Sequence, residues 1–235
     1  MRTKVLEYLK SKQDEKYKIF TAKLLPENID LLGVRIPIIR QYAKQFIKEN
    51  LYKKYLDIPL DKLKYQEELF LYSLLLSHKV KTSETKIEDI NKFVPYINSW
   101  AVCDIFCSEL KEVKNNSSIY LEKFSEYAQS KKEYQIRFFY VLALNYFIKE
   151  EYLEYLFHMI KKQEYVGYYD KMAVAWFLSI AYIKYPKQIE EYLFSSNLDK
   201  FIFNKTISKI CDSFQVKKEA KIHLRKLASE LKSNK

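Results

Sequence analysis

Glycine and proline are scarce in this sequence. Its 235 residues include only 2 Gly and 5 Pro, which leaves little material for hairpin turns or for the glycine-rich loops that cradle phosphates. Leu, Lys, Glu, Ile and Tyr dominate instead, and this usage favours helices over sheets. With 48% hydrophobic and 16% aromatic residues the chain can fill a core. We therefore expect an all-α protein.

The sequence also lacks the motifs of the common enzyme classes. It has no Walker loop, no G-x-G-x-x-G, no H-E-x-x-H and no G-x-S-x-G. His78, His158 and His223 fall on separate predicted helices, and no acidic pair has the spacing of metal ligands. We expect neither a metal nor a cofactor, so any chemistry must use a carboxylate, Arg and aromatic side chains.

Cysteines and long apolar runs are few. Cys103, Cys107 and Cys211 do not have the paired spacing of a disulfide framework, and we expect core thiols. The longest apolar runs, "FFYVLALNYFI" and "MAVAWFLSIAYI", are too short to span a bilayer. The first residues, "MRTKVLEYLKSKQDEKYK", lack the apolar core of a signal peptide. These observations predict a cytoplasmic protein with no membrane partner.

Basic residues outnumber acidic ones. The formal net charge is +11 and the isoelectric point is about 9.2, which favours a polyanionic partner such as nucleic acid or an anionic surface. Only 5 of the 41 basic residues are Arg, and a bias toward Lys across the whole composition gives the same excess. We interpret the Lys pairs as ordinary solvated faces. Charge alone therefore does not decide the partner.

Amphipathic segments of helical period follow one another without long linkers. Helices joined by so few residues pair as antiparallel hairpins, and a spacing of about 35–40 residues per hairpin is typical of an α-solenoid built from HEAT-like repeats. We predict one domain over residues 1–235 with a concave, basic cleft that binds an extended partner. The expected helices are 38–50, 61–80, 84–97, 99–113, 117–130, 133–149, 150–163, 168–184, 187–196, 199–212 and 215–233.

A few polar and aromatic residues interrupt the apolar helices. Asp104 follows Trp100 by four residues in "INSWAVCDIFCSEL", so both lie on one helical face. Arg137 precedes an apolar run, and Trp176 lies in a nearly all-apolar helix. Each has a purely structural interpretation, because both Trp residues can fill the core, Trp100 and Asp104 can pack and cap locally, and Arg137 can form a salt bridge. An unpaired carboxylate on an apolar face is costly, so Asp104 is paired or faces a cleft.

Four segments taken together indicate a family. "LLGVRIPIIRQYAK", "NSWAVCD", "IR" at 136–137 and "KMAVAWFLS", in this order and spacing, resemble the AlkD family of HEAT-like repeat DNA alkylation-repair glycosylases. The similarity extends from about residue 15 to 215. In that family two Trp residues, an Asp and an Arg line the cleft that holds an alkylated nucleotide. The matching positions are Trp100, Asp104, Arg137 and Trp176, and further DNA contacts are expected from Lys171, Arg35 and Lys205.

The resemblance implies hydrolysis of the N-glycosidic bond of cationic N3- or N7-alkylpurines in double-stranded DNA, without the usual extrusion of the base. We expect a monomer, because a capped solenoid does not require a second copy. A cationic purine leaves without a general acid, so Asp104 as the catalytic residue needs only to stabilise an oxocarbenium-like sugar and orient water. Trp100 and Trp176 offer π faces to the cation. Arg137 holds a flanking phosphate.

The sequence departs from the family in two places. The family's minor-groove helix falls where this chain reads "TAKLLPENIDLLG", in which Pro26 disfavours helix and Glu27 and Asp30 place negative charge toward phosphate. Ser179, three residues after Trp176, stands where members of that family commonly have a basic residue. We expect a divergent branch with weak DNA affinity and low or absent excision. The alternatives are a non-catalytic DNA-binding paralogue and a protein-binding α-solenoid.

Overall fold

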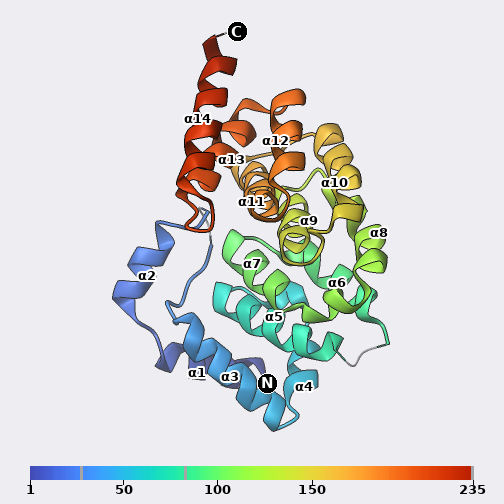
Figure 1. Ribbon diagram of the computed structural model, residues 1–235. Coiled ribbons are helices and arrows are strands. Elements are labelled where there is room, and N and C mark those ends of the chain that lie inside the picture. Colours follow the sequence, from blue (N-terminus) through green and yellow to red (C-terminus); the bar gives the residue numbers. More distant parts are fainter. Residues whose placement is uncertain (27–28, 82–83, 234–235) are drawn as a thin grey trace. The chain divides into compact units, whose positions relative to one another are not determined.

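The computed structural model describes residues 1–26, 29–81 and 84–233, and within them the regular structure is helical (Figure 1). These residues form fourteen α-helices and three short 3-10 helices, with one isolated β-bridge between Asp30 and Tyr65 and no strand in this part of the chain. This confirms the all-α class and is consistent with an α-solenoid of helical hairpins.

The chain packs as two compact units, Met1–Asn116 and Ser117–Lys235. The prediction of a single domain therefore stays a prediction. In the first unit the helices are α1 (Arg2–Ser11), α2 (Glu15–Ala22), α3 (Ile36–Lys48), α4 (Tyr52–Leu56), α5 (Gln66–Val80), α6 (Lys86–Phe93) and α7 (Trp100–Glu109), with 3-10 turns at Leu60–Lys62, Val94–Tyr96 and Lys111–Asn116. In the second they are α8 (Ser117–Ala128), α9 (Glu133–Tyr146), α10 (Glu150–Lys162), α11 (Tyr168–Lys184), α12 (Pro186–Ser195), α13 (Lys200–Asp212) and α14 (Lys218–Ser233).

Helix α5 is the centre of the first unit. It packs against α3 on one side and α7 on the other, and nearly all of its residues are buried. Aromatic rings extend this core. Tyr72 of α5 stacks on Phe93, and Phe93 meets Phe106 of α7 edge to face. Such contacts add to the hydrophobic gain from burial, so they stabilise the packing of α7 through Phe106.

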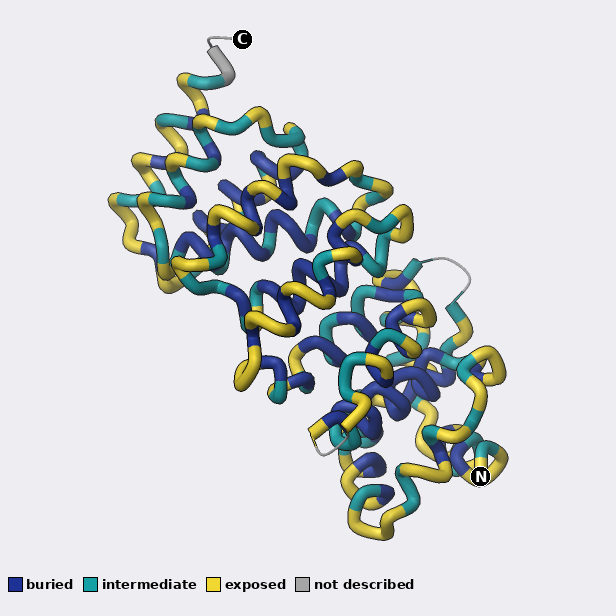
Figure 2. The backbone as a smooth tube through the Cα atoms, turned by 90° about the vertical axis from the view of Figure 1, so that its right-hand side faces the viewer, coloured by how far each residue is buried: buried dark blue, intermediate teal, exposed yellow. Residues whose placement is uncertain are grey.

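Helix α11 has the same place in the second unit, between α9 and α13. Phe138, Phe139 and Tyr140 of α9 and Phe177 of α11 are fully buried. In both units the buried residues form continuous runs on the inner helices, and the exposed residues lie on the outer turns (Figure 2). The sequences of α5 and α11 are largely apolar because neighbouring helices cover each of them on two sides.

Three helices were not expected from the sequence, namely α1, α2 and α4. Helix α1 buries only Val5 and Leu9 and α2 buries none of its residues, so neither has a strong apolar stripe. Helix α4 has five residues, too few for a period of 3.6 to show. The expected segment 61–80 becomes a 3-10 turn followed by α5, which begins at Gln66.

The three cysteines are free and buried, Cys103 and Cys107 within α7 and Cys211 in α13. The prediction of core thiols is therefore confirmed. In the described residues, no helix combines the length and the apolar character that crossing a membrane requires.

Candidate functional site

In the first unit, the beginning of α7 carries Trp100 and Asp104. Ser99 caps this helix, because its Oγ accepts the N–H of Val102 at 3.3 Å and receives a hydrogen bond from Gln66 of α5 at 2.5 Å. Trp100 is the first residue of the helix and Asp104 lies one turn later. Both are partly exposed, whereas Cys103 between them is buried. Asp104 therefore lies at the partly exposed side of a helix whose other side is buried.

The segment after α2 holds the ring of Trp100. The indole N–H of Trp100 donates to the carbonyl oxygen of Leu24 at 2.8 Å, across 76 positions of sequence. Helix α2 ends at Ala22, before Pro26. Glu27, which entered the sequence argument about the minor-groove helix, lies outside the described residues. The proposal that this helix is altered therefore stays a prediction.

The turn before α3 is held by Glu67, a buried residue that the sequence analysis missed. Its carboxylate accepts the backbone N–H groups of Leu32, Gly33 and Val34 at 3.0, 2.7 and 3.1 Å. Gly33 has a positive φ of 86°, and a Cβ there would lie 2.6 Å from the Cβ of Lys18. A carboxylate in the first turn of the buried α5 was the signal for this contact, because a charge so placed needs donors.

Arg35 follows this turn as the residue before α3. It is exposed and pairs with Asp14 at 2.8 Å, with its guanidinium 4.8 Å from the centre of the Tyr17 ring. Asp14 also caps α2 through the N–H of Tyr17 at 2.9 Å. These contacts hold the pKa of Asp14 below its usual value, first through the backbone hydrogen bond and then through Arg35. Arg35 thus ties α2 to α3.

In the second unit, Arg137 and Glu133 hold α9 against the start of α11. Arg137 is only 6% exposed and its Nη1 donates to the carbonyl oxygen of Tyr169 at 3.0 Å. Glu133, one turn earlier, accepts the N–H of Tyr169 at 2.5 Å. The two side chains therefore bind both backbone groups of Tyr169, its carbonyl oxygen and its N–H. This gives Arg137 a positioning contact, and its expected contact with phosphate stays a prediction.

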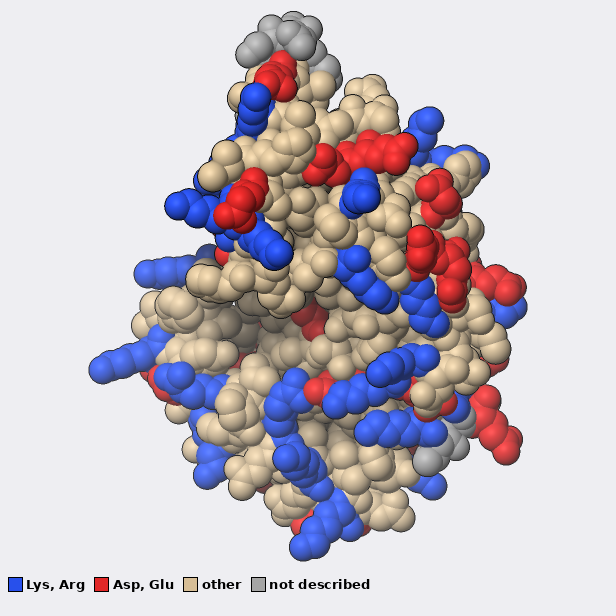
Figure 3. Space-filling view, in the orientation of Figure 1, with Lys and Arg blue, Asp and Glu red and all other residues tan. Residues whose placement is uncertain are grey.

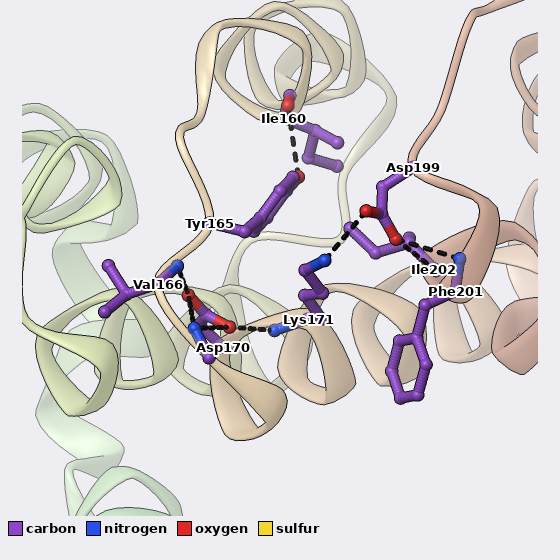
Figure 4. A network of polar contacts seen from close by, with 9 residues as sticks. Ile160, Tyr165, Val166, Asp170, Lys171, Asp199, Phe201 and Ile202 are labelled. Atoms are coloured by element: carbon purple, nitrogen blue, oxygen red, sulfur yellow. Dashed lines mark hydrogen bonds and ion pairs between the residues drawn. The ribbon is translucent and has the colours of Figure 1, made fainter.

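Carboxylates also cap α11 and α13 (Figure 4). Asp170 accepts the N–H groups of Val166 and Gly167 at 2.6 and 3.2 Å. Asp199 accepts from Phe201 and Ile202 at 2.9 and 3.1 Å.

Lys171 joins these two helix starts, because its Nζ lies 2.8 Å from the carboxylate of Asp199. Burial raises the pKa of Asp199, but the hydrogen bonds from Lys171 and from the backbone outweigh burial, and the net pKa is lowered.

Replacing Asp199 by Ala should lower the free energy of unfolding by about 1–2 kcal/mol, because two helix N–H groups lose their acceptor. The folded pKa lies below the ordinary value of 3.8, so this stabilisation is present at pH values above that ordinary pKa and is lost as the pH falls through the folded pKa. Urea unfolding at pH 7 and near pH 3 checks this. The difference between wild type and Asp199→Ala should shrink in acid, while Asp212→Ala, at the exposed end of the same helix, should show neither effect.

Trp176 lies on α11, two turns after Tyr169, and is partly exposed. The ammonium of Lys209 on α13 lies 6.0 Å from the centre of its ring. Ser179 is buried and its Oγ bonds to the carbonyl oxygen of Trp176 at 2.8 Å. The ammonium of Lys205, also on α13, lies 5.8 Å from the Phe201 ring.

The candidate residues thus form two groups, each inside one unit. Trp100 and Asp104 share α7, while Arg35 lies elsewhere in the same unit, at the start of α3. The second group lies on α9, α11 and α13, which pack in succession, and consists of Arg137, Lys171, Trp176 and Lys205.

On the face drawn in Figure 3, Lys and Arg lie over α3 and α5, while acidic residues gather over α10 and α12. A continuous basic cleft stays a prediction. The described residues contain no cluster of three or more His, Cys, Asp or Glu side chains suited to a metal ion.

The sequence model of a family described as "DNA alkylation repair enzyme" matches residues 5–210. The chain belongs to this family. Membership indicates a role in DNA alkylation repair and implies that the protein binds DNA. The match covers all helices from α2 to α12 and most of α1 and α13, and so includes both groups of candidate residues. Among curated proteins, none matches this sequence.

Proposed function

We propose that this protein is a DNA glycosylase that releases cationic N3- and N7-alkylpurines from double-stranded DNA. The observation that carries the proposal is that Trp100 and Asp104 are both partly exposed and lie one turn apart on α7, in a chain of the DNA alkylation repair family. A carboxylate next to an aromatic ring is suited to a substrate that becomes more positively charged at the sugar as its bond breaks.

In this proposal the alkylated purine is already a cation, so it departs with the bonding electrons and becomes neutral without receiving a proton. The sugar is left as an oxocarbenium-like species. Asp104 stabilises that charge and orients the water whose oxygen bonds to the anomeric carbon, and the water proton passes to the carboxylate or to solvent. The ring of Trp100, fixed by its bond to Leu24, offers its π face to the cation and keeps bulk water away.

The direct test is release of 3-methyladenine and 7-methylguanine from methylated duplex DNA. The protein should be in large excess and the salt concentration low, so that weak binding does not conceal the chemistry. Free bases appearing faster than in the absence of protein would support the proposal. No release at any protein concentration would contradict it.

A second candidate is a non-catalytic DNA-binding paralogue, favoured by Ser179, which is buried and bonded within its own helix where the family commonly has a basic residue. It predicts salt-dependent binding to unmodified duplex DNA with few phosphate contacts. The slope of log affinity against log salt should be shallow, close to −0.9 for each phosphate engaged. Fluorescence anisotropy across a salt series measures it, and a slope near zero would remove this candidate.

A further inference from the structure

Four aromatic residues form a row along the N-terminal ends of α9, α11 and α13. Tyr134 of α9 stacks on Tyr169 of α11 with ring centres 5.6 Å apart. Tyr169 meets Tyr168 at 5.2 Å, and Tyr168 meets Phe201 of α13 at 5.5 Å, both close to edge-on. We call Tyr134, Tyr168, Tyr169 and Phe201 the aromatic row. It crosses three helices without a break, all within the second unit.

The row is open to solvent in its central part. Tyr168 is 53% exposed, and the neighbouring Val166 is exposed to a similar degree. Phe201 is partly exposed, and its ring points away from the Asp199 cap of its own helix (Figure 4). The rings of the unit's core, such as Phe138 and Phe177, are fully buried. A ring left half in water gains only part of the hydrophobic stabilisation that its size offers, so packing alone does not account for Tyr168.

Positive charges flank the row. The ammonium of Lys205 lies 5.8 Å from the centre of the Phe201 ring, and Lys132 and Lys200 are exposed beside the first turns of α9 and α13. The carboxylates nearby already have partners. Glu133 bonds to the N–H of Tyr169, and Asp199 pairs with Lys171. The surface around the exposed rings is therefore suited to a polyanion that also carries flat apolar groups.

We propose that the aromatic row binds unpaired nucleotides of single-stranded DNA. Bases stack on Tyr168 and Phe201, and the phosphates between them lie near Lys132, Lys200 and Lys205. Rings interleaved with basic side chains are the usual means of holding single strands, because every base has a π face whatever its identity. In a duplex those faces are covered by neighbouring bases, so the row selects unpaired strands. This binding requires neither Asp104 nor an alkylated base and goes beyond the proposed excision.

The test compares two labelled oligomers of about 15 nucleotides, one of thymidines and one with the same backbone but abasic at every position. Both have the same phosphates, so the difference in their affinity for the full chain reports base stacking. Fluorescence anisotropy should show tighter binding of the thymidine oligomer. Tyr168→Ala and Phe201→Ala should each weaken that binding by roughly 5- to 150-fold, the range for loss of one stacked base, and leave the abasic oligomer unaffected.

Two controls separate stacking from misfolding. Tyr168→Phe keeps the ring and should keep the wild-type affinity. Tyr155→Ala removes a ring that is 41% exposed on α10, outside the row, and should change neither oligomer's binding. Equal affinity of the wild type for both oligomers would overturn the proposal, and so would a preference for thymidine that survives both Tyr168→Ala and Phe201→Ala. A wild-type protein that releases no alkylated bases but still prefers the thymidine oligomer would contradict the proposed glycosylase activity and leave the aromatic-row proposal standing.

Discussion

Replacing Asp104 by Asn should abolish measurable release of 3-methyladenine from methylated duplex DNA. The variant keeps the size and hydrogen-bonding shape of the side chain but removes the negative charge that would face the developing sugar cation. Loss of one preorganised group aimed at transition-state charge commonly slows a reaction by about 10²–10³-fold. Single-turnover release, with protein in excess over lesions, measures the chemical step without a contribution from product release.

The variant should keep the fold and the affinity for DNA, because Asp104 is only partly buried and Asn preserves the shape of its side chain. Thermal unfolding and duplex binding check both. Asp61→Asn is the matched control, since Asp61 lies in the same unit with a side chain 60% exposed, and it should release bases at the wild-type rate. Release by Asp104→Asn at the wild-type rate would remove the carboxylate from the mechanism.

Replacing Glu67 by Ala should destabilise the protein by about 3–5 kcal/mol, because three buried N–H groups lose their acceptor at once. Glu67 alone accepts a bond from all three N–H groups, in a turn where Gly33 has a positive φ of 86°. For a chain of this length the melting temperature should fall by about 6–20 °C. Urea unfolding and a thermal scan measure the two quantities.

Glu7→Ala provides the comparison for Glu67→Ala. Glu7 is an exposed carboxylate on α1 of the same unit, and its removal should change stability by less than about 0.5 kcal/mol. Equal stability of Glu67→Ala and Glu7→Ala would show that water replaces the carboxylate at the turn. The hydrogen bonds of Glu67 would then contribute nothing to the stability of the turn before α3.

The sequence by itself determined the fold class and the faces of most helices. Scarce Gly and Pro, together with the 3.6-residue period, predicted the segments that became α3 and α5–α14, because both signals act within a few residues of the chain. The same local geometry placed Trp100 and Asp104 on one face, since residues four apart are neighbours on any helix. It also identified Cys103 and Cys107 as core thiols, which the structure confirms.

Only the tertiary structure decided which distant groups meet. The bond from Trp100 to Leu24 joins residues 76 positions apart, and that from Arg137 to Tyr169 joins residues 32 apart. The aromatic row likewise forms only when α9, α11 and α13 lie in succession. Helical periodicity fixes the direction of a side chain about its own axis and says nothing of which carbonyl or ring the neighbouring helix presents there. That choice depends on how the whole set of apolar faces packs together.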